Sequence, residues 1–383
     1  MDDPFDRIVG LTEEEQAIFL DEMPRQAPEA SRKRKDRPPL IQSSAEFIDG
    51  FVPPDYLIDG ILQKRFCYSL TAKTGTGKTA VMLRAAAHVA LGRTIGDRRV
   101  ERGKVLYFAG ENPDDIRMRW IGLSQEMAFD PEEAEVYFIA GTFKISAMQA
   151  RITEEMKRIG EFSLIVVDTS AAYFEGEEEN SNSQIGAHAR RLRTLCEMPG
   201  APCVLVACHP VKNAGDDNLL PRGGGAFLAE VDGNLIARKE DSAVAVHWQG
   251  KYRGPDFAEI LFGLRTITHQ RLKDSRGRPI PTVIAYPIGE DARDEMATAA
   301  RKQEDQLLLK LAEMPSASLA DLARALGWTL QTGEPNKMKV SRKLDELEKA
   351  KLIKRKRDGI TLTPAGEKAA AKLKPAEKQA VGD

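Results

Sequence analysis

Residues 70–79 read LTAKTGTGKT, and this stretch is the strongest indication of the fold in the sequence. It follows a short apolar run, residues 66–70, and opens a helical pattern that continues to residue 91. A glycine-rich turn between a strand and a helix points successive backbone N–H groups at a phosphate, assisted by the positive end of the helix dipole. Gly75 and Gly77 suit this turn, because a side chain there would collide with the phosphate or forbid the backbone angles. The stretch therefore predicts a phosphate-binding loop.

The residue types in this loop predict ATP and Mg²⁺ as cofactors. We expect the Lys78 ammonium to reach the β- and γ-phosphate oxygens and the Thr79 hydroxyl to ligate Mg²⁺. Ala72 replaces the usual first glycine, at a position that closes the strand rather than touching phosphate. The alternative is a glycine-rich turn without a ligand. The expected nucleotide-binding residues are Ala72, Lys73, Thr74, Gly75, Thr76, Gly77, Lys78 and Thr79.

Two further apolar runs end in carboxylates. Residues 164–169 read LIVVDT, the form of a Walker B strand, and we expect Asp168 to lie beside the first strand and hold Mg²⁺. Residues 107–112 read YFAGEN, and we expect Glu111 to activate the attacking water. The alternative for this second run is a helix cap, a role that Asn112 fills better than Glu111.

Short apolar runs alternate with helical patterns from residue 47 to residue 287. The expected strands are residues 66–70, 105–109, 136–139, 164–167, 203–207, 233–237 and 243–248, and the expected helices are residues 79–91, 114–127, 147–159 and 183–196. Strands that are apolar on both faces and separated by helices predict an α/β fold, with a mainly parallel sheet covered by helices. The later runs lack long helices between them, which indicates antiparallel or hairpin-linked strands at the end of the sheet.

Together these motifs resemble the RecA-like P-loop ATPases, and most closely the RepA-type branch of ring-forming hexameric helicases from phages and plasmids. The lead-in DYLIDGIL at residues 55–62 and the GENP element at residues 110–113 are similar to that family's motifs. The resemblance covers roughly residues 45–265. It implies a RecA-like core, ATP hydrolysis and a homo-oligomer, which we expect to be a hexamer.

The resemblance also implies roles for the sequences CHPVK at residues 208–212 and RGGGAF at residues 222–227. His209 would sense the γ-phosphate and transmit the effect of hydrolysis to the loop that follows. The alternative is that this lone histidine is purely structural. Lys212 and Arg222 flank that loop, which is similar to the mobile DNA-contacting loop of RecA-like rings. The alternative is that the glycines only satisfy a tight turn.

A third matching segment, residues 250–255, reads GKYRGP. It resembles the cationic finger pair that these rings project into the neighbouring subunit's nucleotide, so Lys251 and Arg253 would meet the transferring phosphoryl group. A finger supplied by a neighbour requires oligomerisation. The alternative is a basic surface strand.

The C-terminal part of the chain is basic, although the whole chain carries a net charge of −2. From residue 299 to residue 383 there are 18 Lys and Arg against 12 Asp and Glu. Helical patterns at residues 307–313, 318–326 and 336–350 precede two β runs joined by Asp358-Gly359. This order resembles a winged helix-turn-helix, which implies duplex DNA binding; docking of a protein is the alternative. The expected DNA contacts are Lys339, Arg342, Lys343, Lys354, Arg355, Lys356 and Arg357.

These patterns predict five segments along the chain. They are a flexible polar arm (residues 1–44), a RecA-like ATPase domain (45–288), a linker (289–302), a winged helix-turn-helix domain (303–370) and a basic, Ala-rich tail (371–383). Hydrophobic residues make up 42% and charged residues 30%, and no run is long and apolar enough to cross a membrane. The four cysteines lack a CxxC pattern, so we expect buried thiols in a reducing cytoplasm rather than metal ligands.

The preferred functional hypothesis is an ATP-dependent DNA helicase for replication, with single-stranded DNA in the ring and duplex DNA at the winged helix. The alternative is a DNA-binding regulatory or loader ATPase, in which ATP switches assembly. A passive ATP-binding scaffold is disfavoured, because it needs neither a water activator such as Glu111 nor fingers such as Lys251 and Arg253.

Overall fold

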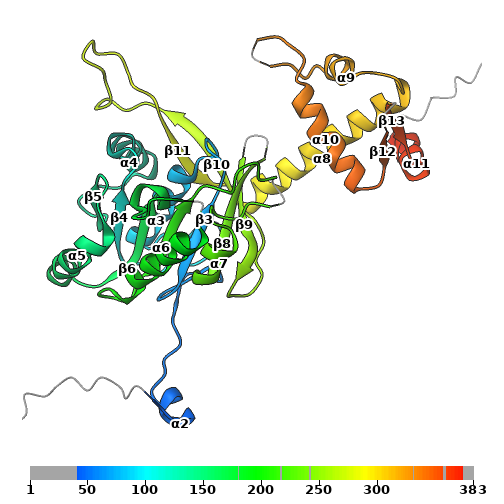
Figure 1. The fold of residues 1–383 in the computed structure, drawn as a ribbon. Helices are drawn as coiled ribbons and strands as arrows, with labels where there is room; N and C mark the ends of the chain where they lie inside the picture. Colours follow the sequence, from blue (N-terminus) through cyan, green and yellow to red (C-terminus); the bar gives the residue numbers. More distant parts are fainter. Residues whose placement is uncertain are drawn as a thin grey trace, which may run out of the picture. The chain divides into compact units, whose positions relative to one another are not determined.

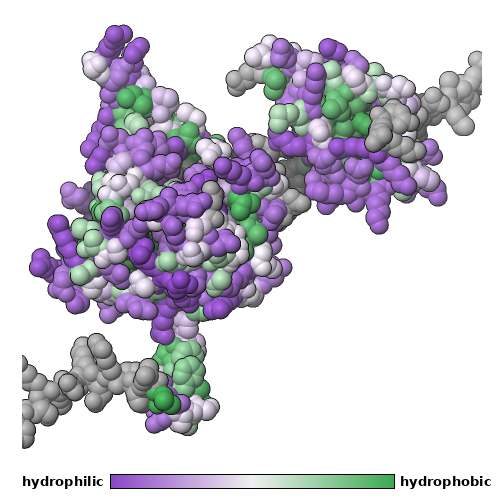
Figure 2. Space-filling model, in the orientation of Figure 1, coloured by the Kyte–Doolittle hydropathy of each residue, from purple (hydrophilic) through white to green (hydrophobic). Residues whose placement is uncertain are grey.

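The computed structural model describes residues 41–179, 181–215, 218–240, 243–330, 332–356 and 359–373. The chain divides into two units, Met1–Pro53 and Pro54–Asp383. In the described part of the first unit, helix α2 (Ser44–Ile48) is closed by a capping box between Ser43 and Glu46. Phe47 and Ile48 expose 73% and 66% of their surface, and Figure 2 shows the hydrophobic colour over this helix.

The second unit is built on a sheet of nine strands in the order β11-β10-β9-β8-β3-β7-β6-β4-β5. In chain order the strands are β3 (Cys67–Thr71), β4 (Lys104–Ala109), β5 (Val136–Ala140), β6 (Phe162–Asp168), β7 (Cys203–Cys208), β8 (Gly233–Glu240), β9 (Ala243–Tyr252), β10 (Ile260–Ile267) and β11 (Thr282–Pro287). The strands from β8 to β5 in this order are parallel, whereas β9, β10 and β11 pair antiparallel. The predicted mainly parallel sheet with an antiparallel end is therefore confirmed.

Alternating side chains of the buried strands enter two separate cores. In β6, Leu164 and Val166 join one cluster while Ile165 and Val167 join the other, as expected for a strand that is covered on both faces. Helices α3 (Lys78–Leu91) and α4 (Pro113–Met127) contribute to the first cluster, and α5 (Ile145–Ile159) and α6 (Asn182–Thr194) to the second. Figure 1 shows the helices around the sheet.

The remaining elements of this region are small. A two-stranded sheet, β1 (Tyr56–Ile58) with β2 (Leu62–Gln63), precedes β3, and helix α7 (Gly225–Glu230) precedes β8. All four cysteines are buried and unpaired, as predicted.

One expectation about the sheet is wrong. The sequence predicted that Asp168 would end a strand beside the first strand, but β7 lies between β6 and β3. Because Val204 to Cys208 pair with Cys67 to Thr71, the strand that ends before His209 is the immediate neighbour of β3. Strand order depends on the packing of crossover helices, which local sequence patterns do not encode.

The C-terminal elements are α8 (Glu290–Glu313), α9 (Leu319–Ala325), α10 (Lys337–Lys349), β12 (Ile353–Lys356), β13 (Gly359–Leu362) and α11 (Pro364–Leu373). Three helices therefore precede an antiparallel pair, β12 with β13, in the predicted order. Their apolar side chains form a third cluster that includes Leu307, Leu322, Val340 and Leu344. The winged-helix assignment stays an interpretation of this order.

Residues 290–302 of the predicted linker form the first part of α8, which starts at Glu290 and continues through the predicted first helix. In α10, Val340 is buried and Met338 is 70% exposed. Several predictions fall outside the described residues. They concern residues 1–40 of the polar arm, the DNA contact Arg357 and residues 374–383 of the tail.

Candidate functional site

The loop between β3 and α3 has the backbone of an anion-binding turn. Gly75 and Gly77 have φ angles of +78° and +103°, which side-chain-bearing residues rarely adopt. A Cβ on Gly77 would lie 2.9 Å from Cδ1 of Leu264 in β10, so this position also lacks space. Helix α3 has no side-chain cap at its N-terminus, which leaves its first N–H groups for an anion.

Lys78 begins α3 and turns its ammonium back toward the loop. Its Nζ donates a hydrogen bond of 2.8 Å to the carbonyl of Ala72, and the residue is buried. Burial lowers the pKa of Lys78, while the nearby charges of Asp168 and Glu111 oppose this shift. The carboxylates of Asp168 and Glu111 are therefore close enough to the phosphate loop to act on the charge of Lys78.

Strands β4 and β6 place the two acids together. Ala109 is the register partner of Asp168, and the N–H of Gly110 donates to the Asp168 carbonyl at 2.9 Å. Glu111 follows directly and is exposed, and its charge raises the pKa of Lys78, Asp168 and His209. Asn112 caps α4 by accepting from the N–H of Asp115 at 3.1 Å, so the cap does not require Glu111.

Asp168 is 1% exposed and only half satisfied. Its Oδ2 accepts a hydrogen bond of 2.8 Å from the Tyr107 hydroxyl, whereas its Oδ1 has no hydrogen-bond partner among the described residues. Burial raises the pKa of the Asp168 carboxyl, and the hydroxyls of Tyr107 and Thr79 and the charge of Lys78 oppose this shift. Tyr107 was missed by the sequence reasoning, because a tyrosine in an apolar strand gives no signal of its partner.

The residues present fit Mg²⁺. Oδ1 of Asp168 is buried and has no hydrogen-bond partner among the described residues. The hydroxyl of Thr79 lowers the pKa of the same carboxyl. Mg²⁺ prefers oxygen ligands, and it binds through one or two protein groups together with substrate phosphates and water. In the described part of the chain, no group of three or more His, Cys, Asp and Glu could hold a metal ion.

His209 directly follows β7, the strand that pairs with β3. The N–H of Ala72 donates to the carbonyl of Cys208 at 3.2 Å, so His209 is the next residue beside the loop. Burial lowers the pKa of His209, and the Lys78 charge lowers it further. The ring is therefore neutral at neutral pH and can donate or accept one hydrogen bond at each nitrogen.

Residues 33–215 match the family model of an AAA domain. This match supports an ATP-binding ATPase of the P-loop, RecA-like type. It covers the phosphate loop, Glu111, Asp168 and His209, and it ends before Arg222, Lys251 and Arg253. No curated protein matches the chain. None of the helices in the described ranges is long and apolar enough to cross a membrane.

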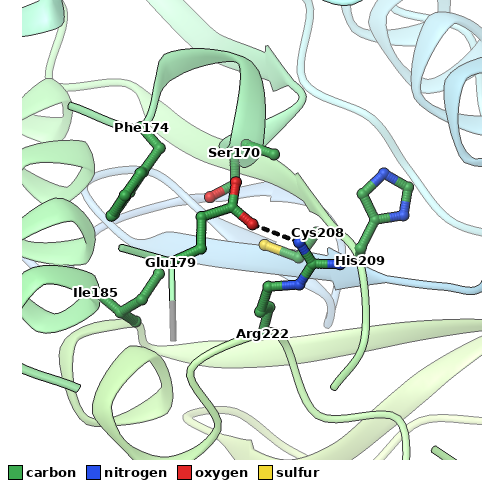
Figure 3. Close-up of a pocket in the computed structure, with 8 residues that line it drawn as sticks. Ser170, Phe174, Glu179, Ile185, Cys208, His209 and Arg222 are labelled. Atoms are coloured by element: carbon green, nitrogen blue, oxygen red, sulfur yellow. Dashed lines mark hydrogen bonds and ion pairs between the residues drawn. The ribbon is translucent and has the colours of Figure 1, made fainter. Parts of the chain in front are cut away.

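A small pocket lies beside His209 (Figure 3). Arg222, which follows the end of the AAA match at residue 215, also lines this pocket. The Arg222 N–H donates to the His209 carbonyl at 2.8 Å, and its guanidinium pairs with Glu179. The pocket holds about 20 Å³ and is lined by Ser170, Ala171, Phe174, Glu179, Ile185, Cys208, His209 and Arg222. Arg222 was predicted to contact DNA, but in this structure its charge is already paired.

The loop between β7 and α7 is held closed at its base. Pro210 and Pro221 form an isolated bridge, and the N–H of Val211 donates to the Leu220 carbonyl at 3.1 Å. Lys212 is exposed on this loop, as a DNA contact would require. Residues 216 and 217 at its tip lie outside the described residues.

Asn234 in β8 links this loop to the phosphate-loop strand, a role that no local sequence pattern predicted. Its Oδ1 accepts from the hydroxyls of Ser69 at 2.8 Å and Thr71 at 2.7 Å. Its Nδ2 donates to the carbonyls of Leu219 at 3.0 Å and Gln249 at 3.1 Å. All four hydrogen bonds of this buried amide are made, so it links three segments rigidly.

Lys251 and Arg253 do not join their own chain's phosphate loop. Strand β9 runs antiparallel to β8, which is parallel to β3, and Tyr252 is opposite Gly233 at the start of β8. The pair therefore lies at the amino edge of the parallel strands, whereas the phosphate loop leaves from the carboxyl edge. This placement keeps Lys251 and Arg253 away from the nucleotide site of their own chain.

Both predicted fingers are anchored within their own chain. The Lys251 ammonium donates to the carbonyls of Leu228 and Ala229, at 2.8 and 2.9 Å. Arg253 pairs at 2.9 Å with the buried carboxylate of Asp232, which also accepts from Arg193 at 2.8 Å. Asp232, which no local sequence pattern predicted, thus holds the guanidinium of Arg253, whose side chain remains 59% exposed.

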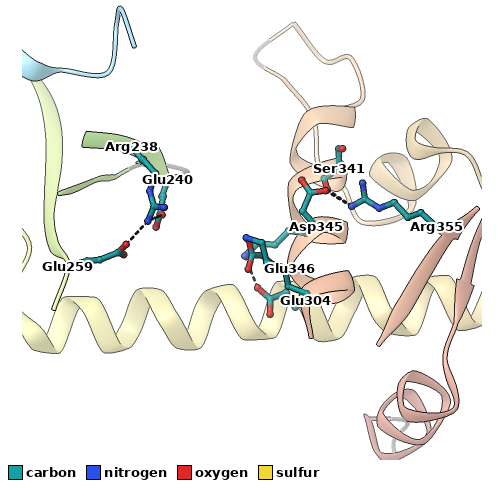
Figure 4. A network of polar contacts seen from close by, with 10 residues as sticks. Arg238, Glu240, Glu259, Glu304, Ser341, Asp345, Glu346 and Arg355 are labelled. Atoms are coloured by element: carbon teal, nitrogen blue, oxygen red, sulfur yellow. Dashed lines mark hydrogen bonds and ion pairs between the residues drawn. The ribbon is translucent and has the colours of Figure 1, made fainter. Parts of the chain in front are cut away.

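Two predicted DNA contacts of the C-terminal region serve structural roles instead. Lys343 has a side chain only 9% exposed and pairs with Glu304 of α8 at 3.0 Å, so it faces the interior. Arg355 pairs with Asp345 at 2.6 Å and donates to the Ser341 carbonyl at 3.1 Å, which fastens β12 to α10 (Figure 4). We remove both residues from the candidate DNA surface.

The other predicted contacts of this region are differently placed. Arg342 and Lys354 are exposed, and the Lys339 ammonium lies 4.8 Å from the ring centre of Trp328. Arg357 and the side chain of Lys356 lie outside the described residues.

Proposed function

We propose that this chain is an ATP-hydrolysing, ring-forming DNA motor, most simply a RepA-like replicative helicase of plasmid, phage or prophage type that works in the cytoplasm as a homo-hexamer. The observation that carries the proposal is the position of Arg253. It is exposed and anchored by Asp232 at the sheet edge opposite to its own phosphate loop. A cation in that place is remote from its own phosphate loop, and on release from Asp232 it could meet a nucleotide held by another subunit, as an arginine finger does.

The residues of the phosphate loop bind and orient ATP in this proposal. The free N–H groups at the start of α3 hold the phosphates, and Lys78 moves from the Ala72 carbonyl to the β- and γ-phosphate oxygens. Thr79 and Asp168 would hold Mg²⁺, which when bound neutralises phosphate charge. Glu111 orients the attacking water and accepts its proton, because it is an exposed acid whose charge acts on both Lys78 and Asp168.

Coupling to DNA would run through His209. Its ring lies beside the phosphate loop. Its carbonyl accepts a hydrogen bond from the N–H of Arg222, at the end of the loop between β7 and α7, here called the Lys212 loop. A shift of His209 on loss of the γ-phosphate would therefore move Arg222 and change its pairing with Glu179. Single-stranded DNA in the ring would meet the Lys212 loop, and duplex DNA would meet Lys339, Arg342 and Lys354.

A loader or regulatory ATPase is the second candidate. The pairing of Arg222 with Glu179 favours it, because it leaves fewer uncompensated cations at the presumed DNA loop. In that case ATP would switch assembly, and the C-terminal region would recognise DNA.

The test is ATP hydrolysis and strand displacement by the full chain on a forked duplex. A helicase should hydrolyse ATP faster with single-stranded DNA and should displace the strand. Lys78→Ala should lose nucleotide binding or turnover, and Glu111→Gln should bind ATP without hydrolysing it. DNA binding with ATP-dependent assembly but no displacement would favour the loader. Unchanged turnover in Glu111→Gln would remove Glu111 from its role.

A further inference from the structure

The loop that joins β10 and β11 is strongly basic. Residues 268–281, here called the basic hairpin, read THQRLKDSRGRPIP and contain Arg271, Lys273, Arg276 and Arg278 against one acid, Asp274. The segment projects from the sheet in Figure 1, and its tip is hydrophilic in Figure 2. No role has been assigned to it so far.

The basic hairpin is ordered by its own hydrogen bonds. The Asp274 N–H donates to the Arg278 carbonyl, and Gly277 donates back to the Asp274 carbonyl, both at 2.9 Å. The N–H of Ile280 donates to the carbonyl of Leu272 at 2.8 Å, and Leu272 is buried. The backbone of the tip is ordered before binding, which lowers the entropy cost of binding.

Its single acid is used internally. The Asp274 carboxylate accepts from the backbone N–H groups of Arg276 and Arg278 at 2.9 Å, and it pairs with the Arg278 guanidinium at 2.7 Å. Arg271, Lys273 and Arg276 remain as exposed cations. Arg271 lies in a turn that the N–H of Leu272 closes by donating to the His269 carbonyl at 2.9 Å, and Lys273 follows two residues later, opposite Pro279.

The basic hairpin leaves the sheet at the edge of the candidate nucleotide site. Strand β10 pairs antiparallel with β9, which is antiparallel to β8, so β10 runs in the direction of β3. Its end at Ile267 therefore lies at the carboxyl edge, as the phosphate loop does. Leu264 of β10 contacts Gly77, and Ile267 contacts Gly122 of α4, where added Cβ atoms would lie 2.9 Å from each side chain.

We propose that the basic hairpin binds the phosphate backbone of nucleic acid through Arg271, Lys273 and Arg276. The choice of nucleic acid as partner rests on the proposed function. It is favoured over a membrane or an apolar protein surface because residues 268–281 contribute no large exposed hydrophobic side chain. Backbone contacts of this kind are sequence-independent and depend steeply on salt.

The contact of Leu264 with Gly77 gives the binding surface a direct connection to ATP. The strand that carries the basic hairpin packs on the phosphate loop, and the start of β11 packs near α4, the helix that follows Glu111. Nucleic acid bound at residues 271–276 would therefore contact a segment that continues directly from the carboxyl edge of the sheet, where the phosphate loop lies.

The test compares the variant Arg271→Gln/Lys273→Gln/Arg276→Gln with wild type in binding of labelled single-stranded and duplex oligonucleotides over a range of NaCl concentrations. The matched control, Arg151→Gln/Lys157→Gln/Arg158→Gln, removes three exposed cations from α5. We expect the hairpin variant to weaken binding at least tenfold and to lower the slope of log K against log salt by about 2 on single strands. The α5 control should keep the wild-type slope, and hydrolysis without DNA should be unchanged in both variants. Restoring charge with Arg271→Lys/Lys273→Arg/Arg276→Lys should restore binding.

Two outcomes would overturn the proposal in distinguishable ways. If wild type binds DNA and the hairpin variant binds equally well with the same salt slope, the basic hairpin is not a contact and the proposed function stands. If wild type binds no oligonucleotide with or without a non-hydrolysable ATP analogue, both fail. Loss of binding to anionic vesicles, with DNA binding retained, would identify a lipid surface as the partner instead.

Discussion

The hydroxyl of Tyr107 donates a hydrogen bond of 2.8 Å to Oδ2 of Asp168, and both residues are buried. This bond leaves Oδ1 as the only oxygen of that carboxyl without a partner among the described residues. Tyr107 therefore restrains the carboxyl of Asp168, whose pKa is also lowered by the Thr79 hydroxyl. A carboxylate with a fixed rotamer is better suited to a Mg²⁺ site than one that is free to rotate.

Tyr107→Phe tests this orientation. Removal of the hydroxyl takes away a hydrogen bond that lowers the Asp168 pKa, so the pKa, already raised by burial, should rise further. A larger fraction of the carboxyl is then protonated at a given pH, and the variant should need more Mg²⁺ and a higher pH for half-maximal hydrolysis. Hydrolysis titrated with Mg²⁺ at several pH values measures both shifts. Tyr68→Phe, which removes another buried hydroxyl, is the control and should leave the Mg²⁺ dependence unchanged.

Asn234→Leu tests the link between the phosphate-loop strand and the Lys212 loop. The substitution keeps the size of the side chain but leaves two hydroxyls and two carbonyls without their partner. We expect a loss of roughly 1–3 kcal/mol in the free energy of unfolding and a reduced stimulation of hydrolysis by DNA. Urea unfolding and hydrolysis with and without single-stranded DNA measure the two effects. Ser69→Ala, which removes one of the four bonds, should cost less, and wild-type stimulation in Asn234→Leu would argue against coupling through this amide.

Arg253→Ala tests action between subunits. Because Arg253 lies at the edge opposite to its own phosphate loop, the variant should still bind ATP but hydrolyse it slowly. A mixture with Lys78→Ala should recover activity, since a Lys78→Ala subunit can lend its Arg253 to an intact phosphate loop. Turnover of the mixture is compared with the sum of the two variants alone. An absence of recovery in mixed assemblies, or a loss of ATP binding by Arg253→Ala itself, would contradict the finger role.

The buried His188 predicts a loss of stability in acid. Burial lowers its pKa from 6.5 to about 4, so below pH 6.5 the unfolded chain takes up a proton that the folded chain does not. Its contribution to stability is present above pH 6.5 and is lost as the pH falls to about 4, by about 3 kcal/mol in total. Urea unfolding of wild type and His188→Gln between pH 7.5 and pH 4.5 checks this. The difference in unfolding free energy between them should change in favour of the variant as the pH falls; a constant difference would show that His188 does not titrate.

The sequence was most informative where function depends on neighbours along the chain. The turn at residues 70–79 needs glycine angles and a following helix, and all of these are local properties. The strand that ends at Asp168 and the element that ends at Glu111 were also predictable, because an apolar run that stops at a carboxylate marks the edge of a parallel sheet.

Residues that act through distant partners could not be predicted in this way. Tyr107 is separated from Asp168 by 61 positions and Asn234 from Ser69 by 165, and neither pair has a local pattern. Lys343 and Arg355 looked like DNA contacts because cations on a helix and a wing are usually exposed. Only the packing of α8 and α10 shows that they pair with Glu304 and Asp345.

Consecutive residues were sufficient to predict a P-loop turn, its strand and helix, and the acids at the ends of two further strands, because backbone angles and hydrophobic periodicity are local properties. Three features could be seen only in the folded chain: β7 separates β3 from β6, Arg253 lies at the sheet edge opposite to its own phosphate loop, and the basic hairpin lies at the same edge as that loop. These three facts depend on which strands pair, and strand pairing is selected by the free energy of the whole packed sheet rather than by any one segment.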